Sequence, residues 1–174
     1  MTGGDDSAIG GDDKAGSGPV ADRVRAVDVG EPEVWAPMLA EIALFAGLDR
    51  PSLRRIAAVG QVARVSAGQV IVREGTSSQG LYVLLTGKAT VQSSDGREVT
   101  LGRGDYFGEL GLLDAAPRTA SVTADADLWV MKLPRRKFLE LMETDPGIAR
   151  GLLETVASRM RRSEAGVAPQ REPT

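Results

Sequence analysis

The hydrophobic pattern changes its period near Gly60, and this change restricts the possible folds more than any other feature of the chain. From Gly60 to Pro134 the sequence divides into short runs of β-branched and apolar residues. The runs are QVARV, QVIVRE, LYVLLTG, KATVQS, REVTLG and SVTADADLWVMKL, separated by AG, TSSQG, SSDG and RGD. Many short strands at such close spacing predict an all-β sandwich, roll or barrel. Asp95-Gly96 gives the clearest hairpin signal, because both residues tolerate the positive φ of tight turns.

Helical spacing of apolar residues flanks this β region on both sides. A first helix is expected from about Pro32 to Gly47, and a second over 51–59 with Asp49 as its cap. After Pro134 two further helices are separated by a break at Asp145-Pro146-Gly147, and the last ends near Glu164. The apolar positions of the first, third and last helices are Trp35, Met38, Leu39, Ile42 and Phe45; Phe138, Leu141 and Met142; and Ile148, Leu152, Val156 and Met160. The predicted architecture is helices, a β-roll, then helices.

The two ends of the chain differ from its centre in composition. Residues 1–30 are rich in Gly, Asp, Ser and Ala and have no hydrophobic period, so we expect a disordered acidic tail there. Residues 165–174 are expected to form a second flexible tail. A chain of 174 residues can bury one sizeable core. We therefore expect a single domain over 31–164.

Composition excludes several classes of function. The chain has neither cysteine nor histidine. This excludes a disulfide scaffold, a thiol nucleophile, a Cys/His zinc site and a histidine general base. No segment has the apolar length of a membrane span, and the acidic N-terminus does not resemble a signal peptide, so we expect a cytoplasmic protein. The acidic residues concentrate before Val34 and leave the remainder close to neutral, which gives no electrostatic case for nucleic-acid binding.

One stretch, FGELGLLDAAPRTASV from Phe107 to Val122, carries chemistry. Gly108 and Gly111 flank the point where the strand pattern gives way to a short helical turn, and glycine lets an anion approach the N–H groups of such a turn. Arg118 supplies a planar cationic fork that suits two phosphate oxygens. Glu109 would repel a phosphate, and it makes sense only if the ligand also carries a hydroxyl donor, as a ribose does. The stretch therefore predicts a site for a sugar phosphate.

These residues resemble the phosphate-binding cassette of the cyclic nucleotide-binding domain family. AGQVIVREG, LYVLLTGKATV and LGRGDYFGE also resemble family segments, and the similarity extends from about Leu44 to Arg162. The resemblance implies a β-roll, or jelly roll, with flanking helices. It further implies that Glu109 accepts a hydrogen bond from the ribose 2′-hydroxyl and that Arg118 pairs with the cyclic phosphate. The residues assigned to the ligand are Gly108, Glu109, Leu110, Gly111, Arg118, Thr119 and Ala120, with N–H donors at Leu110, Gly111 and Ala120.

Several details of the stretch leave alternatives open. Gly111 stands where the family more often has alanine, which loosens the turn without removing a polar contact. Glu109 and Arg118 could instead pair with each other and staple the loop. The hydroxyl of Thr119 can reach a guanine amino group, but members with threonine here include cAMP responders. The ligand is therefore expected to be cAMP or cGMP, without a choice between them.

The expected function is a stand-alone regulatory receptor that binds a cyclic nucleotide and signals to an unknown effector protein through its C-terminal helices. No metal, cofactor, enzymatic activity or membrane is expected. A cupin enzyme would need histidines for its metal, and a phosphodiesterase would need a metal cluster or a nucleophile with its base. A transcription factor would need a helix-turn-helix after Arg162, where only about a dozen residues follow, so DNA is not an expected partner. The alternative is a nucleotide-independent protein interaction module.

The last helix has three possible roles in that scheme. Its apolar stripe could close over the base as a lid, form the seam of a homodimer, or simply pack on the roll. Its arginines lie in the last turn, where cations suit the helix dipole.

Overall fold

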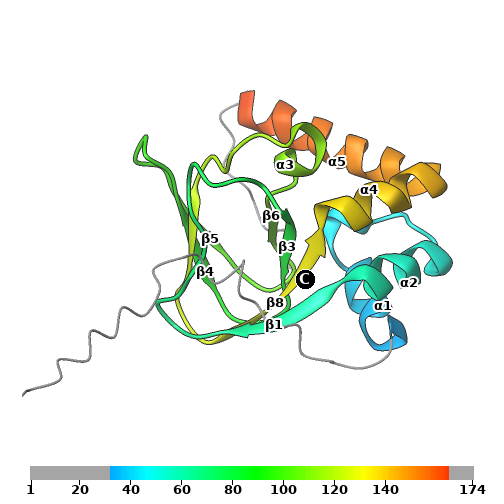
Figure 1. Ribbon diagram of the computed structural model, residues 1–174, viewed down its shortest axis with the longest axis horizontal. Coiled ribbons are helices and arrows are strands. Elements are labelled where there is room, and N and C mark those ends of the chain that lie inside the picture. The colour runs from blue at the N-terminus through cyan, green and yellow to red at the C-terminus, as the bar shows by residue number, and fades with distance from the viewer. Residues whose placement is uncertain (1–31, 165–174) are drawn as a thin grey trace, which may run out of the picture.

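The computed structural model describes residues 32–164, and the tails predicted for 1–30 and 165–174 lie outside the described residues. The described part is mainly β, with two antiparallel four-stranded sheets and flanking helices, as the sequence predicts. The sheets have the orders β1-β8-β3-β6 and β2-β7-β4-β5. Figure 1 shows the roll on one side of the molecule, with α1, α2, α4 and α5 on the other.

The strands are β1 (Gln61–Val65), β2 (Val70–Val72), β3 (Gly80–Leu84), β4 (Ala89–Gln92), β5 (Glu98–Leu101), β6 (Tyr106–Phe107), β7 (Ser121–Ala124) and β8 (Leu128–Pro134). The helices are α1 (Pro32–Ala40), the short 3₁₀ helix η2 (Ala43–Phe45), α2 (Arg50–Val59), α3 (Leu110–Asp114), α4 (Arg135–Thr144) and α5 (Pro146–Glu164). None of the described helices is both long enough and apolar enough to span a membrane.

The hairpin predicted at Asp95-Gly96 joins β4 to β5. Ala89 lies opposite Leu101 and Gln92 opposite Glu98 in an antiparallel register. The turn is closed by the N–H of Ser93, which donates to the carbonyl of Arg97 at 3.1 Å. Gly96 has φ of 83°, the left-handed conformation that the turn chemistry predicts. This prediction is confirmed.

Two hydrophobic clusters share the strands β3 and β8. Successive side chains of a strand point to opposite faces, so a strand between two apolar layers is buried on both. Leu81 and Val83 belong to the cluster formed with the helices, whereas Tyr82 and Leu84 belong to the cluster inside the roll. Every residue of β3 is buried. The continuous apolar run LYVLL is therefore explained by its position between the two layers.

The N-terminal helical region differs from its prediction at one boundary. Apolar spacing predicts one helix to Gly47, but α1 ends at Ala40 and a turn leads into η2. Ile42 has extended dihedral angles, with φ of −86° and ψ of 126°. Leu39, Ile42 and Phe45 are nevertheless all buried in the helical cluster. The periodicity identified the buried side chains correctly, and the chain turns between them because that keeps all three in one core.

The other helix boundaries follow the local chemistry of the sequence. Asp49 caps α2 through a side-chain oxygen that accepts from the N–H of Ser52 at 2.8 Å. Asp145 separates α4 from α5, which begins at Pro146. In α5, Ile148, Leu152 and Val156 are buried, so these three positions of the stripe pack in the helical core.

Candidate ligand-binding site

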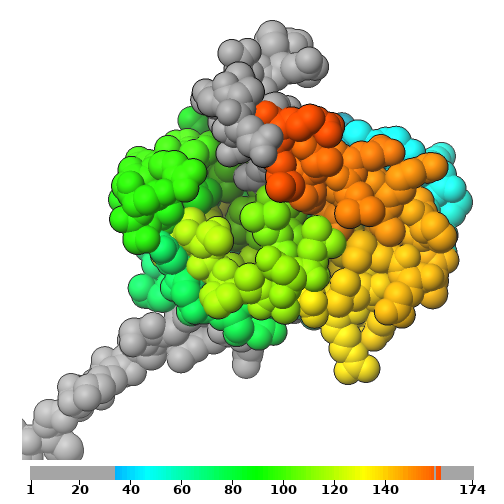
Figure 2. Space-filling view, turned by 90° about the horizontal axis from the view of Figure 1, so that it is seen from above, coloured from blue at the N-terminus to red at the C-terminus, as the bar shows by residue number. Residues whose placement is uncertain are grey.

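The stretch from Phe107 to Val122, called the cassette below, connects β6 to β7 across the surface of the roll. Glu109 lies at the N-terminal end of α3, with φ of −63° and ψ of −35°. The helix ends after Asp114, because Ala115 adopts a left-handed conformation with φ of 55°. Figures 1 and 2 show α3 beside α5 on this face of the molecule. Within the cassette, α3 packs against β3 and α4 and lies beside the last helix.

Arg118 is buried although it carries a charge and belongs to a surface connection. Its side chain donates from Nη2 to the carbonyl of Gly80 at 2.7 Å. Its Cζ lies 5.3 Å from the centroid of the Tyr82 ring. That ring stacks on Phe107, with centroids 5.1 Å apart and an interplanar angle of 9°. The guanidinium is therefore held in one place by a carbonyl and an aromatic pair.

The main chain of Arg118 is held as firmly as its side chain. Its N–H donates to the carbonyl of Thr76 at 2.8 Å, and its carbonyl accepts from the N–H of Gly75 at 2.8 Å. Both partners belong to the β2–β3 loop, residues 73–79, which precedes Gly80. This loop fixes the backbone and, through Gly80 at the start of β3, the guanidinium of the same residue.

Gly108 has two reasons to be glycine. Its φ of 86° is a conformation that other L-residues rarely adopt. A β-carbon at this position would also lie less than 3.0 Å from Nη1 of Arg118, well inside the distance of ordinary contacts. The structure therefore places Gly108, at the start of the cassette, directly against the guanidinium of Arg118, which lies ten positions further along the chain.

The remaining predicted site residues differ in exposure. Glu109 is 6% exposed and Arg118 is 8% exposed, which makes them two of the four buried polar or charged residues of the described chain. Gly111 is buried, Ala120 is half-buried and Thr119 is exposed. Leu110 is 47% exposed. Charged side chains are rarely buried unless something compensates their charge, so the burial of Glu109 and Arg118 makes the cassette a candidate site.

Three residues outside the predicted set also form this region. Tyr82 and Gly80 contact the Arg118 side chain as described above. Arg135, the first residue of α4, donates from Nε to the carbonyl of Gly111 at 3.1 Å and from its N–H to the carbonyl of Gln79 at 3.0 Å. Sequence reasoning missed them because the run LYVLL is explained by its strand pattern and an arginine beginning a helix carries no positional signal. Only the fold brings them to the cassette.

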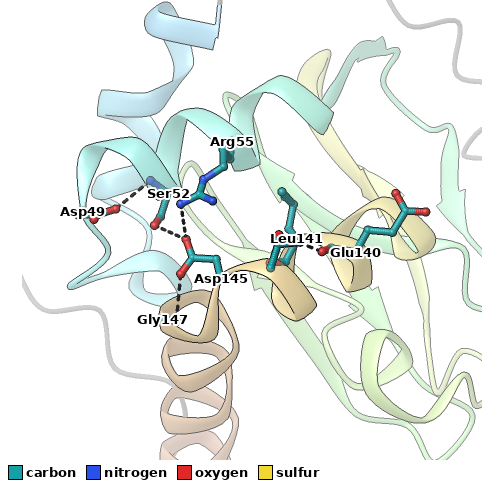
Figure 3. Close-up of polar contacts among 8 residues, drawn as sticks. Asp49, Ser52, Arg55, Glu140, Leu141, Asp145 and Gly147 are labelled. Atoms are coloured by element: carbon teal, nitrogen blue, oxygen red, sulfur yellow. Dashed lines mark hydrogen bonds and ion pairs between the residues drawn. The ribbon is translucent and has the colours of Figure 1, made fainter.

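The predicted break at Asp145 is the centre of a polar cluster at the other end of α4 (Figure 3). Asp145 Oδ2 accepts from Ser52 Oγ at 2.5 Å and from Arg55 Nη2 at 2.9 Å, while Oδ1 accepts from the N–H of Gly147 at 3.1 Å. The hydrogen bond from Ser52, followed by those from the backbone and the charge of Arg55, holds the pKa of Asp145 below its ordinary value. This cluster joins α2 to the junction of α4 and α5.

Metal chemistry has no support in the described part of the chain. No group of three or more His, Cys, Asp or Glu residues between residues 32 and 164 could hold a metal ion. The chemistry available at the cassette is instead that of a buried cation and a buried carboxylate close to a helix start.

The sequence matches the cyclic nucleotide-binding domain family over residues 62–145. It is 33% identical over 119 residues to the cAMP-dependent protein kinase regulatory subunit of Colletotrichum orbiculare, covering 67% of this chain and 30% of that protein. It is 28% identical over 136 residues to the CRP-like cAMP-activated global transcriptional regulator of Mycobacterium tuberculosis, covering 75% of this chain and 61% of that protein. The chain therefore spans less than two thirds of the length of either of these curated relatives.

One solved structure is similar to this protein over nearly the whole length of the solved chain. The N-terminal domain of a transcriptional regulator from Streptomyces coelicolor superposes with a TM-score of 0.63 and 30% sequence identity, covering 76% of this chain and 99% of that one. The chain belongs to the cyclic nucleotide-binding domain family. The three relatives named here are regulatory proteins or a domain of one, and the family resemblance inferred from the sequence is confirmed.

Proposed function

We propose that this chain is a regulatory receptor that binds a cyclic nucleotide, cAMP or cGMP, in the cassette. The observation that carries the proposal is the burial of Arg118, whose guanidinium and backbone are both fixed by the segment from Gly75 to Gly80. Fixing a charged fork in advance removes the ordering cost that a flexible arginine adds to binding.

The roles of the site residues follow from their chemistry. Arg118 pairs with the cyclic phosphate through two parallel N–H donors. Glu109 accepts a hydrogen bond from the ribose 2′-hydroxyl, and the N–H groups of Leu110, Gly111 and Ala120 donate to the phosphate. Gly108 gives way to the guanidinium because it lacks a side chain. The names of both curated relatives refer to cAMP, which supports cAMP as the first ligand to test.

Signalling is proposed to use the helices after β8. The first turn of α4 is joined to the cassette by Arg135, and its end is joined to α2 by Asp145. A ligand that draws the cassette inward therefore acts on the first turn of α4. The other end of α4 is followed directly by Asp145 and the start of α5. Such a ligand switches the protein only if it binds the two arrangements with different affinity.

The last helix offers two outward apolar side chains for that purpose. Leu153 and Met160 are each 58% exposed, while the buried part of the stripe is already used in packing. We propose that these exposed residues cover the base or contact the effector protein or a second copy of the chain. Ile148, Leu152 and Val156 are buried, which supports a purely structural packing role for these three positions of α5.

Calorimetric titration tests the proposal directly. The protein is titrated with cAMP, cGMP and a cyclic dinucleotide, with linear 5′-AMP and 2′-deoxy-cAMP as controls. We expect saturable binding of cAMP or cGMP, weaker binding of the 2′-deoxy analogue and still weaker binding of the linear nucleotide. Glu109→Gln should bind cAMP less tightly while binding 2′-deoxy-cAMP about as well as the parent. No binding of any cyclic nucleotide would favour the alternative, a protein interaction module on the same fold.

A further inference from the structure

The backbone conformation of Gly111 does not explain why this residue is a glycine. It lies in the first turn of α3, and unlike Gly108 it does not have a positive φ. In a helix alanine is favoured over glycine by about 1 kcal/mol. A glycine in this place therefore weakens the helix start that carries two of the proposed N–H donors. Something other than backbone conformation must require it.

The side chain of Ser78 occupies the space that a β-carbon at 111 would need. Such an atom would lie less than 3.0 Å from both Oγ and Cβ of Ser78, a separation that real β-carbons essentially never show. Ser78 is 8% exposed, so it cannot simply swing out into solvent. Its Oγ is fully buried and has no hydrogen-bond partner among the described residues. The pair is therefore a tight steric fit and not a polar contact.

Ser78 belongs to the same β2–β3 loop that fixes Arg118. Thr76 and Gly75 hold the backbone of Arg118, while Ser78 abuts Gly111. We call Arg118 and the first turn of α3 together the cradle, because both are proposed to donate to the phosphate. The β2–β3 loop contacts both parts of this cradle. The distance between these two parts must match the size of the anion, because both donate to it.

The structure assigns to Ser78 the role of a positioning residue that sets the place of the first turn of α3 relative to Arg118, with Gly111 as its obligatory partner. This assignment rests on the proposed function for the identity of the ligand. It goes beyond that function because it names a residue outside the cassette that determines the geometry of the cradle. A larger residue at 111 displaces α3 from the loop by the width of the overlap.

Four variants separate the steric effect from other effects. Gly111→Ala introduces the overlap, and Ser78→Gly with Gly111→Ala removes it again. Ser78→Ala with Gly111→Ala retains the β-carbon of Ser78 and so retains part of the overlap. Gly151→Ala is the matched control, because it is also a helical glycine but its β-carbon would meet only Leu48 Cδ2 at an ordinary 3.5 Å.

Affinity for cAMP is measured by calorimetry well below each melting temperature, and each melting temperature is measured without nucleotide. We expect Gly111→Ala to bind about tenfold more weakly or worse, since a cradle misplaced by about an ångström loses its fit. Ser78→Gly with Gly111→Ala should return to within about threefold of the parent, because the two positions are coupled. Ser78→Ala with Gly111→Ala should remain impaired, and Gly151→Ala should bind like the parent.

Parent-like binding by Gly111→Ala, or failure of Ser78→Gly to restore it, overturns the assignment. A parent that binds no cyclic nucleotide refutes the proposed function instead. In that case the melting temperatures decide: a loss in Gly111→Ala that Ser78→Gly reverses supports the steric pairing, and additive losses overturn it.

Discussion

The interior of the roll and the helical layer share β3 and β8, yet they are held together in different ways. The roll is closed by hydrogen-bonded ladders between strands that lie far apart in the sequence, such as β1 with β8 and β4 with β7. The helical layer has side-chain packing and a few polar links, of which the Asp145 cluster is the most connected. A region held by packing and a small polar cluster opens more readily than one held by ladders. If the cassette binds a ligand as proposed, we therefore expect the helical layer to be the part that moves.

Large-to-small substitutions in the two cores are expected to give the largest effect, measured as a loss in the free energy of unfolding. Phe138 of α4 is fully buried, with its ring 6.4 Å from that of Phe45, and Leu84 of β3 is fully buried inside the roll. Phe138→Ala should lower the free energy of unfolding by about 3–5 kcal/mol and Leu84→Ala by about 2–5 kcal/mol. Denaturant titration measures both.

Amide exchange distinguishes which region each substitution loosens. Phe138→Ala should accelerate exchange in α4 and α5 while the β4–β5 hairpin stays protected. Leu84→Ala should accelerate exchange in the strands as well. Equal acceleration of both regions in both variants would show that the molecule opens as one unit.

Arg118→Ala should weaken binding of the cyclic nucleotide by about 2–4 kcal/mol, because it removes a charge-assisted pair from a partly buried site. Arg118→Lys should recover only part of this loss, since an ammonium lacks the fork that two phosphate oxygens need. Calorimetric titration of each variant with the cyclic nucleotide up to saturation measures both affinities. Unchanged affinity in a folded Arg118→Ala variant would contradict the assignment of the cassette as a phosphate site.

Asp145→Asn tests whether the helical layer depends on its polar cluster. The folded state lowers the pKa of Asp145, chiefly through the hydrogen bond from Ser52, so the carboxylate stabilises the fold when it is ionised. This contribution is fully present above the ordinary pKa of about 3.9 and is lost as the pH falls through the lowered pKa. At neutral pH the variant should melt a few degrees below the parent.

The pH dependence provides the control for that comparison. The difference in melting temperature between Asp145→Asn and the parent should be constant from neutral pH to about pH 5 and should shrink below about pH 4. Ser52→Ala should reproduce part of the loss in melting temperature, because the hydrogen bond from Ser52 is the largest cause of the lowered pKa of Asp145. A difference that persisted unchanged in acid would mean that ionisation of Asp145 does not contribute.

The smallest expected effect is the response of α5 to nucleotide. Saturating ligand should slow amide exchange over 148–160 as well as in the cassette from Gly108 to Ala120, measured by mass spectrometry. Protection confined to the cassette would show that α5 is not a lid and that its outward Leu153 and Met160 have another partner. Sedimentation at several concentrations then tests whether that partner is a second copy of the chain.

Much of the candidate site could be proposed from the sequence, because its polar residues lie in one continuous stretch. The pattern around Glu109 and Arg118 predicts a ligand that carries a phosphate and a hydroxyl donor, and this prediction needs no knowledge of the fold. Tyr82, Gly80 and Arg135 could not be found in this way, since each has a sufficient local explanation in a strand or a helix start. Gly111 stood out in the sequence as a departure from alanine, but its cause lay thirty-three positions away in Ser78.

The sequence by itself determined the fold class, the hairpin at Asp95-Gly96, the cap at Asp49 and the break at Asp145, because turns, caps and periodicity depend on neighbouring residues. Tertiary structure alone decided where α1 ends, which strands pair across the two sheets, and that Ser52 meets Asp145. It also decided that one loop supports both Arg118 and Gly111. These features depend on contacts between distant segments, whose geometry is set by the packing of the whole core and by no local pattern.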